Sequence, residues 1–170
     1  LTYKQEGRTT TGMTKQGARA HEVTPEITGA GRLTVYGLFR AQVSRDPEAT
    51  AVVEGGRSTT YAALDARARR LASALHAKGI RRGDRIAVLS QNSTEYIEIE
   101  LAAAMIGAIV ACQNWRLTAP ELKGCLDLVE PGLIFVSERF SPLLASVGET
   151  EAPAIMIETD YEEFVAKIGR

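Results

Sequence analysis

The stretch at residues 85–136 decides the fold, and it reads RIAVLSQNSTEYIEIELAAAMIGAIVACQNWRLTAPELKGCLDLVEPGLIFV. Three short apolar runs in this stretch are typical of buried strands, at 85–90, 108–112 and 133–136. Two longer segments between them have helical patterns, at 94–105 and 119–129. Strands that alternate with helices in this way form βαβ units. The stretch therefore predicts a parallel sheet with right-handed crossover connections.

Short signals mark the ends of these helices. Asn92 is predicted to cap the first helix, with Glu95 three residues later as its capping partner. Gly107 should end that helix before the second strand. Thr118 and Glu121 have the spacing of a capping box at the start of the second helix. The sequence thus predicts where each crossover helix begins or ends.

Upstream of this stretch, residues 61–78 form the clearest amphipathic helix. An apolar stripe runs along it at Leu64, Ala68, Leu71 and Leu75. Thr60 is suited to the N-cap and Gly79 to the left-handed residue after the last turn. Basic residues lie mostly off the stripe, and we interpret them as a solvated face: Arg67, Arg69, Arg70 and Lys78.

Two smaller elements precede that helix. Apolar residues have helical spacing at Val35, Leu38, Phe39 and Val43. The pair Asp46-Pro47 should end this helix, because the residue before proline avoids the helical region. The β-prone runs 51–54 and 57–60 flank Gly55-Gly56, which predicts a tight hairpin.

The predicted fold class is α/β, with a partly parallel sheet, helices on both of its faces and a small β-hairpin. Near the end of the chain, 154–157 is expected to be a fourth strand and 161–168 a short helix. Residues 1–32 have no apolar period, so we expect a flexible N-terminal tail before a domain at 33–170. Met13 lies in that tail and could be the true start of translation.

Composition limits the classes of function. The chain has 170 residues, 45% hydrophobic and 24% charged, with a net charge of −1. This balance gives no reason to expect nucleic acid as a partner. The two cysteines and two histidines have no disulfide or metal spacing, so no metal site is assigned. No apolar run is long enough for a membrane span and no secretory signal opens the chain, so we expect a cytoplasmic protein.

A series of short motifs runs through the chain from Leu33 to Ser137. In chain order they are Asp46-Pro47 with Ala51-Val52, Thr60-Tyr61 with Leu64, Leu71-Ala72 with Leu75, Gly79-Ile80 with Gly83-Asp84-Arg85-Ile86-Ala87, Asn92-Ser93 with Glu95, Gly107-Ala108, and Asn114-Trp115-Arg116-Leu117-Thr118 with Glu121-Leu122. Their order resembles the N-terminal part of the adenylate-forming (AMP-binding) family, which includes acyl-CoA synthetases, luciferases and the adenylation domains of peptide synthetases. The last motif is similar to acyl- or aryl-CoA ligases rather than to peptide synthetases.

The resemblance implies an activity that needs more than this chain. Family members use ATP and Mg²⁺ to convert a carboxylic acid to an acyl-adenylate, and then usually transfer the acyl group to CoA. The family's Ser/Thr/Gly-rich phosphate loop, its later motifs and its catalytic lysine have no match in the 170 residues. We therefore expect the N-terminal fragment of an acyl-CoA synthetase, inactive alone, with no catalytic residue and with no cofactor bound well. Its acid substrate and homo-oligomeric state are left open.

Arg116 is the one residue to which the resemblance gives a binding role. Some CoA ligases have an arginine at this place, near the CoA nucleotide phosphate. A guanidinium suits that task because it donates two parallel hydrogen bonds to phosphate oxygens. The alternative is that Arg116 pairs with a nearby carboxylate such as Glu121 and only fixes its loop.

Other functional interpretations are weaker or stay open. Glu95, Glu98 and Glu100 suit the positive end of a helix dipole, so we do not assign them as a catalytic acid and base. Cys112 lacks a histidine motif and is interpreted as a small buried apolar residue rather than a nucleophile. Two alternatives remain: a stand-alone binding module derived from such an enzyme, and an unrelated flavodoxin-type domain with a phosphate loop at 91–94.

Overall fold

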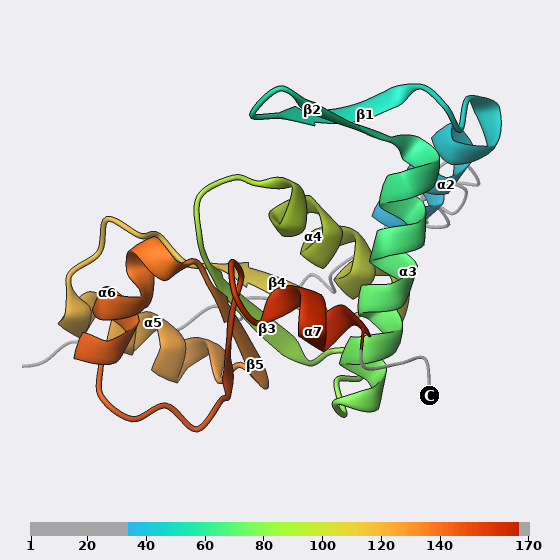
Figure 1. Ribbon diagram of the computed structural model, residues 1–170. Coiled ribbons are helices and arrows are strands. Elements are labelled where there is room, and N and C mark those ends of the chain that lie inside the picture. Colours follow the sequence, from blue (N-terminus) through green and yellow to red (C-terminus); the bar gives the residue numbers. More distant parts are fainter. Residues whose placement is uncertain (1–33, 167–170) are drawn as a thin grey trace, which may run out of the picture. The chain divides into compact units, whose positions relative to one another are not determined.

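The computed structural model describes residues 34–166 (Figure 1). The expectations for the tail at 1–32, including a start at Met13, lie outside these residues. Among the described residues, no helix is both long and apolar enough to cross a membrane.

A four-stranded parallel sheet forms the centre of the described chain. Its strands are β3 (Arg85–Leu89), β4 (Ile109–Cys112), β5 (Leu133–Val136) and β6 (Ala154–Met156). Their spatial order is β4-β3-β5-β6, and each neighbouring pair is parallel. The three strands predicted within 85–136 and the fourth predicted at 154–157 are therefore confirmed.

Helices cover both faces of this sheet, as predicted. The crossovers are α4 (Thr94–Ile106) between β3 and β4, α5 (Ala119–Val129) between β4 and β5, and the short helices η1 (Glu138–Phe140) and α6 (Ser141–Ser146) before β6. The helices α3 (Tyr61–Ala77) and α7 (Tyr161–Ala166) join α4 on one face, while α5 and α6 lie on the other. Figure 1 shows the two groups on opposite sides of the strands.

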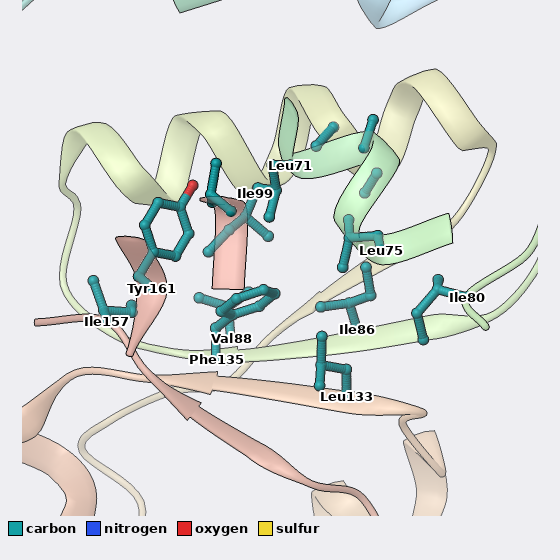
Figure 2. Close-up of a cluster of buried hydrophobic side chains, with 14 residues drawn as sticks. Leu71, Leu75, Ile80, Ile86, Val88, Ile99, Leu133, Phe135, Ile157 and Tyr161 are labelled. Atoms are coloured by element: carbon teal, nitrogen blue, oxygen red, sulfur yellow. The ribbon is translucent and has the colours of Figure 1, made fainter. Parts of the chain in front are cut away.

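Alternation along the strands divides the core into two clusters. In β3, Ile86 and Val88 face the α3–α4–α7 side, and Ala87 and Leu89 face the α5–α6 side. Figure 2 shows the first cluster, where the strand residues meet side chains of three helices: Leu71, Leu75, Ile99 and Tyr161. Because successive side chains point to opposite faces, the buried strands read as continuous apolar runs.

The N-terminal elements pack beside α3. The hairpin strands β1 (Thr50–Glu54) and β2 (Arg57–Thr60) are antiparallel, and Gly55 and Gly56 have φ of 55° and 80°. Two successive positive φ angles are what the predicted tight turn requires. Helix α2 (Val35–Arg45) is present too, but no residue of it is buried.

Three local expectations need correction. Helix α4 is capped by Ser93 and not by Asn92, because the Ser93 hydroxyl accepts the Tyr96 N–H at 3.2 Å. Arg67 does not belong to a solvated face, since it lies half-buried in an ion pair with Glu98. The helices η1 and α6 were not predicted. By contrast, Gly107 ends α4 in the left-handed conformation with φ of 74°, as expected.

The strand order creates a crevice at one end of the sheet. From β3 the chain passes to β4 on one side, and from β4 it crosses back to β5 on the other side. The helices that follow β3 and β5 cover opposite faces. Ligands in α/β proteins commonly bind outside the carboxyl ends of the strands at such a switch point. The order itself matches that of flavodoxin-type sheets, so topology alone does not decide between those interpretations.

Candidate functional site

The carboxyl-end edge of the sheet brings the candidate residues together. Loops follow β3 at 90–93, β4 at 113–118, β5 at 137 and β6 at 157–160. Arg116, the predicted binding residue, lies in the second of these loops. The sequence placed it correctly after a strand of a parallel sheet.

Local hydrogen bonds hold the Arg116 loop in a fixed turn. The Gln113 N–H donates to the Val88 carbonyl at 2.8 Å, which extends the pairing beyond β4. Asn114 Oδ1 accepts the Arg116 N–H at 3.0 Å, and the Leu117 N–H donates to the Asn114 carbonyl at 3.1 Å. Such an Asx turn orders the backbone without using the arginine side chain.

Two stacked aromatic rings carry two guanidinium groups on this edge. Trp115 stacks on Phe140 with 5.4 Å between ring centroids and 18° between ring planes. The Arg116 guanidinium carbon lies 4.0 Å from the Trp115 ring centroid. That of Arg139 lies 6.0 Å from Trp115 and 5.6 Å from Phe140. Cation–π contacts of this kind hold a charged group in place while its donors still face water.

The alternative role for Arg116 does not agree with the structure. Both the N–H and the hydroxyl of Thr118 donate to Glu121 Oε2, each at 2.8 Å, in the predicted capping box. These hydrogen bonds, the backbone one first, lower the pKa of Glu121. Within residues 34–166, no carboxylate forms an ion pair with Arg116. The exposed guanidinium therefore keeps its hydrogen-bond donors available for an anion.

Arg139 is a candidate that sequence reasoning missed. It follows β5, and its Nη1 donates to Gln91 Oε1 at 3.0 Å. Its contact with Trp115 spans 24 residues of sequence, so no local spacing indicates it. The usable signal was its position just after a predicted strand of the same sheet.

The phosphate-loop interpretation of residues 91–94 is wrong. Glu54 from the hairpin accepts the Thr94 N–H at 3.0 Å and the Thr94 hydroxyl at 2.6 Å. These two hydrogen bonds lower the pKa of Glu54, and the one from the Thr94 hydroxyl has the larger effect. A carboxylate thus already occupies the helix N-terminus where a phosphate would bind.

A second polar cluster is buried in the core, away from the Arg116 loop. Glu98 accepts from Arg67 Nε at 2.6 Å and from the Tyr161 hydroxyl at 2.7 Å, and Arg67 also binds Glu162. The pKa of Tyr161 is raised mainly by burial and secondly by the negative charge of Glu98. The pKa of Arg67 is raised, and the largest cause is its hydrogen bonding to Glu162. Every carboxylate here has a partner, so the cluster ties α3, α4 and α7 together.

Cys112 is exposed, not buried as expected. It lies beside Tyr96, whose pKa is raised by burial first and then by its contact with Cys112. Within the described part of the chain, no group of three or more potential metal ligands is assembled. These residues thus add neither a catalytic constellation nor a metal centre to the Arg116 edge.

The family model for "AMP-binding enzyme" matches residues 39–168. The chain belongs to the AMP-binding enzyme family. This match includes the whole sheet, the Arg116 loop and Arg139, and it replaces the flavodoxin-type alternative.

Relatives of this AMP-binding chain include two curated ligases. A fatty acid–[acyl-carrier-protein] ligase, ScoC, of Streptomyces coeruleorubidus is 37% identical over 128 residues, covering 75% of this chain and 24% of the relative. A feruloyl-CoA synthase of an Amycolatopsis species is 46% identical over 87 residues, covering 51% of this chain and 17% of the relative. The chain therefore spans about a quarter or less of these relatives.

A solved structure supports the same placement. The N-terminal domain of FACL13 from Mycobacterium tuberculosis superposes with a TM-score of 0.73 at 27% identity. The alignment covers 79% of this AMP-binding chain and 36% of that domain. The α/β architecture with its parallel sheet is thus that of the N-terminal region in this family.

Proposed function

We propose that this chain is the N-terminal part of an ATP-dependent acyl-CoA synthetase and is inactive alone. The observation that carries the proposal is the family match over residues 39–168, which covers the N-terminal portion of much longer ligases. Helix α2 agrees with this reading, since its Val35 and Leu38 side chains are 67% and 57% exposed. Exposed apolar side chains of this kind are typical of a surface that another segment covers.

The proposed reaction has two steps. A carboxylate oxygen of the acid attacks the α-phosphorus of ATP, so that a C–O–P linkage forms and the bond to pyrophosphate breaks. The CoA thiolate then attacks the acyl carbon, and AMP leaves with the electron pair of the C–O bond. The thiol proton passes to solvent. None of these steps is assigned to a side chain of residues 34–166.

Within that enzyme, we assign Arg116 to the binding of a CoA phosphate, with Arg139 as a second cation. Support comes from the exposed guanidinium over Trp115 and from the absence of a carboxylate partner among the described residues. Two cations close to one aromatic pair suit a phosphate beside a planar base.

The first test is the mass of the native polypeptide in its source cells. A mass well above 18.4 kDa, in a protein that shows acid-dependent ATP–pyrophosphate exchange, is the expected result. The 170-residue chain should show no exchange. A native mass equal to that of the chain would overturn the synthetase proposal and favour the stand-alone binding module.

A separate test addresses Arg116. In the full-length synthetase, the KM is measured for CoA and for 3′-dephospho-CoA. We expect the KM for CoA to be about tenfold lower than that for the dephosphorylated form, as one charge-assisted hydrogen-bond pair predicts. Arg116→Ala should remove the difference, and the control Arg70→Ala, on the exposed side of α3, should keep it. Equal KM values in the unaltered synthetase would refute the role of Arg116.

A further inference from the structure

The crevice at the switch point is a cavity of about 470 Å³. It lies among the loops that follow β3, β5 and β6, and its walls include Asn92, Glu95, Ser137, Arg139 and Glu158. This volume is within the range that small-molecule sites have in proteins. Trp115 does not line this cavity, whereas Arg139 lines it and also contacts the Trp115 ring.

One buried hydroxyl faces this cavity without a partner. Ser137 is 7% exposed, and its backbone is fully used: the N–H donates to the Leu89 carbonyl and the carbonyl accepts from Phe140. Its hydroxyl forms no hydrogen bond within residues 34–166 and does not cap η1. No side-chain oxygen or nitrogen of the described residues is both fully enclosed and unpartnered. The Ser137 hydroxyl must therefore reach the crevice, where it can donate to or accept from a ligand.

The charge of the crevice is negative. Four carboxylates line it, from Glu54, Glu95, Glu158 and Glu162, against the single guanidinium of Arg139. Arg139 is already bonded to a neighbouring amide oxygen. An anion would meet this excess of carboxylates, whereas a cation would be attracted by it.

Three of these carboxylates have structural partners and one does not. Glu54 caps α4, Glu158 accepts the Glu138 N–H at 2.7 Å, and Glu162 binds Arg67. Glu95 forms neither a hydrogen bond nor an ion pair within the described part of the chain. Glu95 is thus the carboxylate of the cavity, and Ser137 its buried hydroxyl, that keep full capacity for a ligand; the Asn92 amide also lines the cavity without a hydrogen bond within residues 34–166.

We propose that the crevice binds a small organic cation, a primary ammonium on a body that also carries a hydroxyl group. The ammonium supplies three donors and pairs with Glu95. The hydroxyl exchanges a hydrogen bond with Ser137. This site goes beyond the proposed CoA ligase function and does not depend on it, because its groups are distinct from Arg116.

Ethanolamine is the matched probe, since it has one ammonium and one hydroxyl group. In a titration of the ¹⁵N-labelled 170-residue chain, saturating amide shifts are expected near Glu95, Ser137 and Glu158. Glu95→Gln should weaken binding about tenfold, and Ser137→Ala about threefold, as the loss of a charged and of a neutral hydrogen bond predicts. The control Glu149→Gln, which lines a different cavity beside α5, should leave the affinity unchanged.

Several outcomes would overturn the proposal. Shifts that do not saturate, or an equal loss in Glu149→Gln, would make the effect general charge attraction. If inorganic phosphate binds the crevice more tightly than ethanolamine, the crevice prefers an anion and not the proposed cation. A lysine-containing tripeptide that binds about tenfold more tightly would assign the crevice to a basic protein segment. Ser137→Ala keeps the size of the side chain nearly unchanged, and an unaltered amide spectrum away from the crevice verifies its fold.

Discussion

Replacing Arg67 with methionine should destabilise the chain by about 3 kcal/mol, because the change leaves a buried carboxylate without its cation. The Glu98 side chain is 2% exposed, and that of Arg67 is 26% exposed. Removing one partner of a buried pair costs about 3–5 kcal/mol. We take the lower end because Arg67 reaches water and because the Tyr161 hydroxyl still donates to Glu98.

Urea denaturation followed by circular dichroism measures this loss. Arg70→Met on the same helix is the control, since Arg70 is exposed and its one hydrogen bond within residues 34–166 is to the Ala66 carbonyl at 3.3 Å. It should change the free energy of unfolding by about 0.5 kcal/mol or less. The triple variant Arg67→Met, Glu98→Met and Tyr161→Phe should regain most of the lost stability, because it removes the buried carboxylate that Arg67→Met leaves without its cation together with the hydroxyl that donates to it. Glu162 also loses Arg67, but its side chain is 70% exposed and remains hydrated.

Two results would refute the reasoning. If Arg67→Met costs no more than Arg70→Met, the ion pair contributes as little as a surface pair. If the triple variant is no more stable than Arg67→Met, the stability lost in Arg67→Met comes from packing and not from the unpaired charge of Glu98.

Two further predictions concern single elements. Because hydrogen bonds from Thr94 lower the folded pKa of Glu54 below its unfolded value of 4.5, their contribution is present above that value and is lost as pH falls through the folded pKa. Glu54→Gln should therefore cost about 1 kcal/mol near neutral pH and almost nothing once the pH is well below the folded pKa of Glu54, measured by thermal unfolding; a cost independent of pH would contradict this. Gly107→Ala should cost about 1–2 kcal/mol, since φ is +74° and the new Cβ would lie 3.0 Å from Arg82 Cγ. Gly124→Ala inside α5 meets no atom within 4 Å and should stabilise by about 0.5–1 kcal/mol, and equal effects of the two glycine changes would refute the backbone argument.

The elements that were predictable are those whose signals are local. Strands β3 and β5 are buried on both faces and read as apolar runs, and Gly107 stands where only glycine is relaxed. Neighbouring residues in the sequence did not indicate whether Asn92 or Ser93 is the N-cap of α4. Glu54 reaches the start of α4 from 40 residues away and helps to fix its first turn. Nothing adjacent to α4 indicates that contact.

Long sequence separations also explain what was missed in the cores and at the edge. The partners of Arg67 lie 31 and 95 residues away, so a run of arginines resembled a solvated face. Arg116 could be proposed from the sequence because its loop has a recognisable local pattern, and its binding role stays a prediction. Arg139 was not, because its relation to that loop depends on the stacking of Trp115 on Phe140. The short helices η1 and α6 have too few residues for a periodic signal.

The edge of the sheet combines two regions of opposite charge, and the crossover connections explain why they are neighbours. The order β4-β3-β5-β6 puts the loop after β4 on one side of β3 and the crevice on the other. Arg116 lies on the first side and Glu95 lines the second, while Arg139 contacts the Trp115 ring and also lines the crevice. A phosphate beside Arg116 and an ammonium beside Glu95 would therefore use separate groups, so the two proposals do not compete.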